Sequence, residues 1–369
     1  MSPTPSSASY RPQLDGLRTV AVFLVMAHHW LPKNITRGIH WGGIGVDLFF
    51  CLSGFLITGI LLNCRGYIAS GQQGIGYTVR QFSMRRLVRI FPLYYLVLAL
   101  TLPFLEVGGG TQASLWTYTY NVYGGLSGNL NGAISHFWSL AVEEQFYLLW
   151  PWIVLATPTR LLPHALLLTT AVGPLTRFGL LLSDVPVEAV RTLTPACFDT
   201  LGLGSLLAWM VHHHGLEAVA RGRMAKGLLA LGLPLALAGA WLQLGRRPVA
   251  ELETWRVMIT STRAPLLAWF VLRGALGFGG VAGRFLSSGP MVYLGRISYG
   301  LYVYHAFALF LPGKSLHPLL RFCFWGAASV AMASLSWHLF ESRVNVLKDR
   351  FPYRKRSADG ESPPSQLAA

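Results

Sequence analysis

The sequence predicts an all-α integral membrane protein with about ten transmembrane helices and both termini in the cytoplasm. Of its 369 residues, 53% are hydrophobic and only 12% are charged, which is about half the charged fraction of a typical soluble domain. The apolar residues form runs of about 20, the length that crosses a bilayer. The net charge of +15 lies between these runs, as in positive-inside topology. We therefore expect the lipid bilayer as a partner, and no nucleic acid.

Ten segments have the length and composition of a span. They cover residues 17–35, 43–63, 88–107, 136–157, 161–182, 195–213, 227–245, 257–277, 289–312 and 319–340. The N-terminus before the first run is polar, and no small-residue cleavage site follows that run. We interpret the first run as a retained span rather than a cleaved signal.

Basic residues set the expected orientation of the spans. Clusters follow the second, sixth and tenth spans, at 65–89, 221–226 and 343–356, whereas the connection 108–135 has no Lys or Arg. All three clusters face the cytoplasm if both termini do. Three arginines break this pattern: Arg246, Arg247 and Arg256.

One transmembrane domain accounts for residues 1–350. Residues 351–369 are basic and then rich in Pro and Ser, a composition typical of a disordered cytoplasmic tail. The four cysteines are scattered without a C-x-x-C pair, so we expect neither a disulfide framework nor a metal site.

The first span has ionisable residues at both ends. Arg18 and His29 are eleven residues apart, which places them within about 20° of one helical face and about 16 Å apart along the axis. His28 points about 100° away, so the spacing pairs His29 with Arg18. Ionisable residues inside spans are functional by default, and a neutral histidine is a general base near neutral pH. The alternative is an anchoring role for Arg18, with both histidines at the outer interface.

Asp47 lies near the outer end of the second span. A carboxylate there can orient an imidazole and stabilise its charge, and we expect this role for Asp47. The alternative interpretation is an interfacial carboxylate that stabilises the start of its helix.

The motif MRRLVR precedes the third span on the expected cytoplasmic side. Arg86 and Arg89 are three residues apart and share a helical face. Guanidinium groups bind phosphate in bidentate geometry. The motif indicates phosphate binding, with a plain topology anchor as the alternative.

Further polar residues lie in the fourth, ninth and tenth spans. Glu143 and Glu144 are adjacent and cannot share one helical face, so we expect them to have different partners; structural pairing with an arginine is the alternative to a role in the site. Tyr302 and His305 are candidates for a pocket wall. Glu341, at the inner end of the last span, is expected to meet the basic cluster.

Six stretches of the chain, taken in order, resemble the acyltransferase-3 family of multipass membrane O-acyltransferases. They are LDGLR…HHW, GGIGVDLFFCLSGFLIT, RRLVRIFP, HFWSLAVEEQFYLLWP, FDTLGLGSLLA and GRISYGLYVYH. Together they extend over residues 10 to 345. Each stretch alone is a weak signal, but six in this order are specific.

The resemblance implies transfer of an acyl group, commonly acetyl, from acyl-CoA to a hydroxyl of a carbohydrate-containing acceptor. Acyl-CoA would be a co-substrate, and no bound cofactor is expected. The acceptor class includes surface polysaccharides, lipid-linked sugars and glycosylated metabolites. The resemblance also implies a multi-pass protein of the inner (plasma) membrane.

The family motifs match particular residues of this chain. The Arg and His of the first span match Arg18 and His29, and the family's R-x-x-R matches Arg86 and Arg89, which the resemblance places near the CoA phosphates. The WSLxxEExF element and the last-span glutamate match Glu143, Glu144 and Glu341. One departure is Asp199, which follows Cys197 and Phe198 where many members have a basic residue.

We therefore expect His29 to act as a base, oriented by Asp47 and electrostatically tuned by Arg18, while the acceptor hydroxyl attacks the acyl carbon. In a second version His29 first accepts the acyl group itself. A rival from another class is a transporter or flippase for a lipid-linked sugar, which explains intramembrane charges equally well. A non-catalytic membrane scaffold is a third interpretation.

Overall fold

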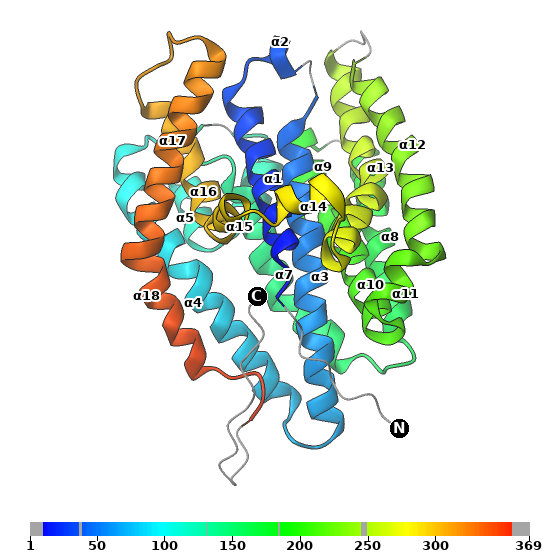
Figure 1. The fold of residues 1–369 in the computed structure, drawn as a ribbon. Helices are drawn as coiled ribbons and strands as arrows, with labels where there is room; N and C mark the ends of the chain where they lie inside the picture. The colour runs from blue at the N-terminus through cyan, green and yellow to red at the C-terminus, as the bar shows by residue number, and fades with distance from the viewer. Residues whose placement is uncertain (1–9, 37–38, 131, 184, 245–248, 356–369) are drawn as a thin grey trace.

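A computed structural model describes residues 10–36, 39–130, 132–183, 185–244 and 249–355, and every regular element within these ranges is a helix (Figure 1). The long helices are α1 (Pro12–Trp30), α3 (Trp41–Ala69), α4 (Ile75–Thr101), α7 (Phe137–Ala156), α8 (Leu162–Leu181), α10 (Phe198–His214), α12 (Arg223–Leu244), α13 (Val249–Leu276) and α17 (Pro318–Ser336). Each predicted span except 289–312 overlaps one of these helices, although the boundaries differ, as in Ile75–Thr101 against the predicted 88–107.

Short helices connect the long ones. They are α2 (Lys33–Thr36), η1 (Leu102–Phe104), α5 (Gly109–Trp116), α6 (Tyr120–Leu126), α9 (Val187–Thr192), η2 (Thr194–Cys197), α11 (Leu216–Arg221), α14 (Gly280–Leu286), α15 (Gly289–Arg296), α16 (Ser298–Tyr304), η3 (His305–Phe310), η4 (Trp337–Glu341), α18 (Ser342–Asn345) and η5 (Val346–Arg350).

Four helical stretches are long and apolar enough to cross a membrane, and a bent pair brings the number to five. They are Trp41–Ala69, Ile75–Phe104, Arg223–Leu244 and Pro318–Arg350, with the pair Met258–Leu276 and Gly280–Leu286 bent by 83°. Other long helices have buried charged residues in the apolar run, as α7 does with Glu144. The all-helical membrane class is confirmed, whereas ten crossings and two cytoplasmic termini stay predictions.

The prediction of one continuous helix over 289–312 is wrong. The segment is divided into α15, α16 and η3, and α14 and α15 lie across the front of the bundle in Figure 1. A Cβ atom on Gly295 would lie 2.1 Å from the Asp15 carbonyl oxygen, so α15 packs directly on the backbone of α1. This close approach fixes the direction of α15, and the chain turns at Ile297 before it enters α16.

Helix α3 lies at the centre of the bundle, and α10 packs against it at backbone distance. A Cβ atom on Gly54 would lie 2.0 Å from the Leu201 carbonyl oxygen, and one on Gly204 would lie 2.2 Å from the Cys51 carbonyl oxygen. Small residues are the usual means of such close contact between membrane helices. The two glycines therefore allow α3 and α10 to pack closely, and this packing positions the polar residues of α3.

The basic clusters at 65–89 and 343–355 lie at one end of the molecule, the lower end in Figure 1. Arg85 Nη1 donates to the Lys348 carbonyl oxygen at 2.9 Å, and Gln73 Nε2 donates to the Tyr353 carbonyl oxygen at 2.9 Å. The two clusters thus share a side, as the orientation argument requires. Arg246, Arg247 and most of the predicted tail, 356–369, lie outside the described residues.

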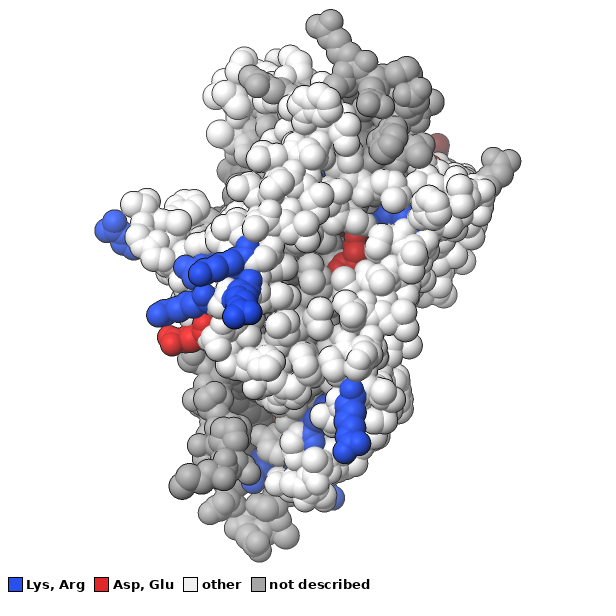
Figure 2. Space-filling view, turned by 90° about the vertical axis from the view of Figure 1, so that its right-hand side faces the viewer, with Lys and Arg blue, Asp and Glu red and all other residues white. Residues whose placement is uncertain are grey.

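The outer surface along α8 and α12 is apolar. Large exposed hydrophobic residues there include Leu167, Leu168, Leu175, Phe178, Leu231, Leu237 and Trp241. Figure 2 shows this side of the molecule as largely uncharged, with Lys and Arg confined to separate groups. Such a surface fits contact with lipid acyl chains rather than with water.

Candidate active site

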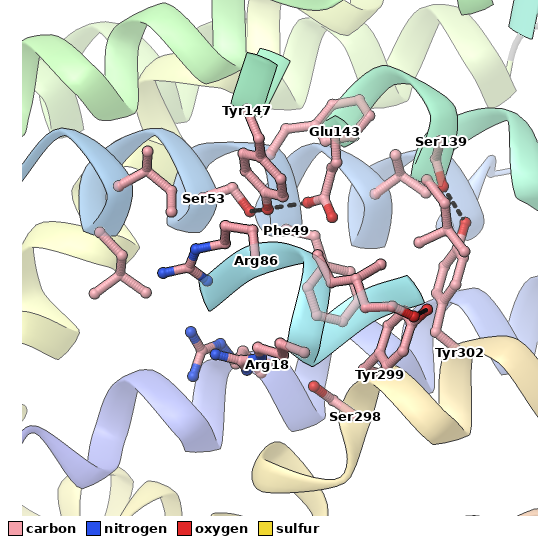
Figure 3. Close-up of a pocket in the computed structure, with 17 residues that line it drawn as sticks. Arg18, Phe49, Ser53, Arg86, Ser139, Glu143, Tyr147, Ser298, Tyr299 and Tyr302 are labelled. Carbon is pink, nitrogen blue, oxygen red and sulfur yellow. Dashed lines mark hydrogen bonds between the residues drawn. The ribbon is translucent and has the colours of Figure 1, made fainter. Parts of the chain in front are cut away.

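A cavity lies between α1, α3, α4, α7 and α16 (Figure 3). Its lining consists of Arg18, Val46, Phe49, Phe50, Ser53, Leu56, Ile57, Arg86, Arg89, Ile90, Ser139, Leu140, Glu143, Tyr147, Ser298, Tyr299 and Tyr302. Five of the predicted site residues belong to this lining: Arg18, Arg86, Arg89, Glu143 and Tyr302. The helices that meet here are far apart in the sequence, so the cavity is a product of the tertiary fold.

Three arginines line the cavity together with one glutamate, so its charge is positive. Arg18 forms an ion pair with Asp15, with 2.7 Å between Nη1 and Oδ1. Within the described ranges Arg86 and Arg89 have no carboxylate in ion-pair contact, and the buried Nε of Arg86 has no hydrogen-bond partner. The Arg86 guanidinium lies 5.9 Å from the centre of the Tyr147 ring. Two cations therefore line the cavity without a carboxylate in direct ion-pair contact in the described part of the chain.

The wall opposite these arginines is polar. Ser53 Oγ donates to Glu143 Oε1 at 2.8 Å and lies 3.2 Å from Tyr147 Oη, as the dashed lines in Figure 3 show. The sequence did not indicate Ser53 and Tyr147 as site residues, because isolated Ser and Tyr residues in apolar runs are usually packing residues. The sequence signal for Tyr147 is that it lies four residues after Glu143 and so shares its helical face.

Glu144 and Glu341 lie outside the cavity. Glu144 is buried, and its Oε1 has no hydrogen-bond partner in the described part of the chain. A separate partner for Glu144 therefore stays a prediction. Glu341 accepts a hydrogen bond from Ser336 Oγ at 2.7 Å, within the π-helical turn η4. Its interaction with Arg89 is a longer-range electrostatic attraction rather than a direct ion pair.

A hydroxyl pair lines the far end of the cavity. Tyr302 Oη lies 2.5 Å from Ser139 Oγ and donates to the His136 carbonyl oxygen at 3.1 Å. In Figure 3 this pair is at one end of the cavity, and the guanidinium groups of Arg18 and Arg86 are at the other. Tyr302 lines the cavity, whereas His305 lies behind it, with 5.5 Å between the two ring centres.

His29 lies beyond Tyr302 and His305 and is exposed at the surface. Its Nδ1 is 2.9 Å from the Val25 carbonyl oxygen and 3.3 Å from His305 Nε2. His305 is fully buried, and its ring centre is 4.9 Å from that of His136. Tyr302 and His305 thus form a continuous line of contacts from the cavity wall to His29.

Asp47 does not have the partner expected from the sequence. Its Oδ2 accepts a hydrogen bond from Arg263 Nε at 2.6 Å in a largely buried ion pair. The described contacts of the His29 ring nitrogens are with Val25 and His305 instead. The expectation that Asp47 orients His29 is therefore not met, because an arginine on α13 neutralises the carboxylate.

Sequence comparison identifies the family. Residues 11–341 match the family described as an acyltransferase domain. The chain belongs to the acyltransferase-3 family. No solved structure matches it.

Curated relatives in the acyltransferase-3 family carry the name O-acetyltransferase. The chain is 27% identical to "Peptidoglycan O-acetyltransferase OatA" of Listeria monocytogenes, over 92% of this chain and 56% of that protein. It is 27% identical to "O-acetyltransferase OatA" of Staphylococcus aureus, over 81% of this chain and 50% of that protein. It is also 27% identical to "Putative peptidoglycan O-acetyltransferase YrhL" of Bacillus subtilis, over 91% and 55%. The chain spans about half the length of these relatives.

The departure at Asp199 from the usual acyltransferase-3 pattern has a structural counterpart. Asp199 forms a bidentate ion pair with Arg177 of α8, at 2.6 and 2.9 Å, and Arg177 also donates to Ser261 Oγ at 2.6 Å. The basic partner of Asp199 thus comes from another helix rather than from the preceding residue. An arginine inside the apolar run 161–182 was the sequence signal for this pair.

Proposed function

We propose that this chain is a membrane-embedded O-acyltransferase that moves an acetyl group from acetyl-CoA to a hydroxyl of a carbohydrate acceptor. The observation that carries the proposal is the cavity in which Arg86 and Arg89 lack a described anionic partner. Burial of an unpaired cation is costly unless an anion completes the site. The diphosphate and phosphate groups of CoA are anions of the kind that arginine forks bind best.

The cavity suits a ligand that is anionic at one end and reactive at the other. Its arginines are on the helices next to the basic end of the molecule, which is the expected cytoplasmic side. Its opposite end leads through Tyr302 towards His29. We place the CoA phosphates at Arg86 and Arg89 and the thioester at the end lined by Ser139 and Tyr302, with acetyl-CoA as a co-substrate and no bound cofactor.

His29 is the proposed base for the transfer. The acceptor O–H gives its proton to the imidazole as its oxygen attacks the thioester carbon, the C–S bond breaks, and the thiolate receives the proton from the imidazolium. The exposed side of His29 lets an acceptor approach from outside the bundle. In the relay version the imidazole attacks first, forms an acyl-imidazole with release of the thiol, and then passes the acyl group to the acceptor.

The proposed acceptor is a glycan of the cell envelope. Two of the curated relatives are named for peptidoglycan, so peptidoglycan hydroxyls are the first acceptors to test. Location in the inner membrane, with the arginine end of the cavity towards cytoplasmic acetyl-CoA, belongs to the same proposal.

Washed membranes supplied with acetyl-labelled acetyl-CoA test the function directly. We expect covalent label in a glycan product from membranes with the wild-type chain, loss of that label with His29→Ala, and retention with the neighbouring His28→Ala. Equal insertion of the variants is checked by their amount in the membrane. If no label enters the glycan while export of a lipid-linked sugar is intact, the result supports the transporter instead. If the His29→Ala variant labels the glycan fully, His29 has no part in the mechanism.

A further inference from the structure

Two hydrogen-bond acceptors converge on one nitrogen of His29. The Val25 carbonyl oxygen lies 2.9 Å from Nδ1, and His305 Nε2 lies 3.3 Å from the same atom. A carbonyl oxygen can only accept. The hydrogen of a neutral His29 ring is therefore on Nδ1, and its Nε2 has the lone pair.

The tautomer of His305 follows from the same rule. His305 Nδ1 lies 2.6 Å from the Tyr302 carbonyl oxygen, so Nδ1 donates and His305 Nε2 has the lone pair. That lone pair faces the Nδ1–H of His29. The contact between the two rings is thus a donor against an acceptor, and the donor and acceptor roles are consistent at all five polar atoms that take part.

We propose that His305 is a positioning residue that, together with the Val25 carbonyl, holds His29 as the Nδ1–H tautomer with Nε2 ready to accept a proton. The inference rests on the proposed function of His29 as the base. It assigns His305 to His29 rather than to the substrate pocket, where the sequence had placed it. The ring nitrogen that reacts in a histidine is set in general by the hydrogen bond that the other nitrogen makes.

The fold holds His305 in place by a second contact with α1. Trp30 Nε1 donates to the His305 carbonyl oxygen at 3.2 Å, so consecutive residues of α1 contact the ring and the backbone of His305. His305 is the residue at which α16 ends and η3 begins. The change of helix type turns the chain at the point where it meets the end of α1.

The contact also bears on the protonated state of His29. When Nε2 accepts a proton, the positive charge spreads over both nitrogens, and hydrogen bonds from a cationic donor are stronger than neutral ones. The His305 lone pair and the Val25 carbonyl then stabilise the imidazolium without taking its proton. His305 need not change its own protonation state during the reaction.

Nitrogen NMR of the histidine-labelled full-length chain in lipid tests the proposal without turnover. We expect a protonated Nδ1 and an unprotonated Nε2 for His29, assigned by the signals lost in His29→Ala, and a ¹⁵N–¹⁵N correlation between His29 Nδ1 and His305 Nε2. A His29 protonated at Nε2 in its neutral state, or the absence of the correlation, would overturn the proposal. The NMR measurement does not depend on whether acetyl-CoA is the acyl donor.

Variants at position 305 give the kinetic test. His305→Leu removes the acceptor, and we expect kcat to fall about 10- to 100-fold, the usual size for loss of a residue that orients a histidine, with KM for acetyl-CoA unchanged. His305→Gln places a carbonyl oxygen near the former Nε2, and we expect it to retain most of the activity. His28→Leu, the same change beside His29, is the control.

The pattern of losses separates the two proposals. If all three variants keep the wild-type kcat, the positioning role is wrong while the acyltransferase function stands. Suppose that His305→Gln is as impaired as His305→Leu and that the wild-type protein shows no His29–His305 correlation. The ring of His305 then serves packing alone. If His29→Ala itself is fully active, the proposed function fails, whatever the tautomer.

Discussion

Arg177 and Arg263 are each bound by a carboxylate inside the bundle, whereas Arg86 and Arg89 line a cavity without a described carboxylate partner. Arg177 and Asp199 are 3% and 4% exposed in their side chains and are joined by two hydrogen bonds. Arg263 and Asp47 are similarly close, at 11% and 9% exposed. The same residue type therefore occurs in two electrostatic states within one membrane protein.

The difference separates arginines that stabilise the fold from the arginines at which we propose that a ligand binds. A buried ion pair is already neutral, and removal of one member leaves a charge in a medium of low dielectric constant. An unpaired arginine at a cavity has no such dependence on a protein partner. Substitutions in the two sets should thus have opposite effects on stability and on ligand binding.

We expect the largest effect from the combined substitution of Arg86→Gln and Arg89→Gln, which should weaken the binding of CoA. Hydrogen bonds to charged groups contribute about 1.5–3 kcal/mol each, so loss of one from each arginine should weaken the equilibrium binding of CoA at least 100-fold. Thermal stability should stay the same or rise, because the mutual repulsion of the arginines is relieved.

Arg85→Gln is the matched control for this pair. Arg85 belongs to the same basic cluster but donates to backbone carbonyls of the C-terminal segment. We expect it to lower stability and to leave the Kd of CoA unchanged. Equal weakening by all three substitutions would return Arg86 and Arg89 to a topology-anchor role.

Asp199→Asn should have the next largest effect, on stability. It leaves the Arg177 cation buried without its counter-charge, and rupture of a buried pair costs about 3–5 kcal/mol. Thermal unfolding of the purified protein in detergent measures the loss. Joint replacement of Arg177 and Asp199 by leucine should recover most of it, and a double variant as unstable as the single one would show that the charge balance is not what matters.

Asp47→Asn tests the second ion pair with a smaller expected loss of about 1–3 kcal/mol, because this pair is more exposed and is joined by one hydrogen bond. The kcat of the folded fraction should be near that of the wild type. A large fall in kcat at unchanged melting temperature would restore the catalytic role that the sequence predicted for Asp47.

The smallest effect is expected for Ser53→Ala in the cavity wall. It removes one hydrogen bond to Glu143, which contributes about 1 kcal/mol, so the Kd of CoA should change by less than about tenfold. Ser329→Ala, a buried serine outside the cavity lining, is the control for loss of a hydroxyl. A change in Kd as large as that of the arginine pair would shift the centre of recognition to Ser53 and Glu143.

Helical periodicity explains which parts of the site were predictable. The shared face of Arg86 and Arg89, and the separate faces of Glu143 and Glu144, depend only on the geometry of one helix. In the structure both arginines and Glu143 line the cavity, whereas Glu144 does not. The prediction of Tyr302 as a pocket-wall residue likewise rested on its place in one apolar run. The partner of Asp47 was not predictable, because Arg263 is more than 200 residues away and meets it only through the packing of α13 on α3.

The break of the segment 289–312 shows the same limit. Its composition is that of a span, but the absence of a side chain at Gly295 lets α15 lie on the backbone of α1. Whether a glycine is used in this way depends on what packs against it. The consequence is functional, since the division into α16 and η3 brings His305 to His29.

The sequence by itself determined the membrane class, the acyltransferase-3 motifs and the residues that share a helical face, because hydropathy and helical period are local properties. Only the tertiary structure decided which of the described charges are neutralised, which arginines line the cavity, and which polar atoms contact the ring nitrogens of His29. These are contacts between helices distant in the chain, and their energies depend on distances of a few ångströms that arise only when the bundle is packed.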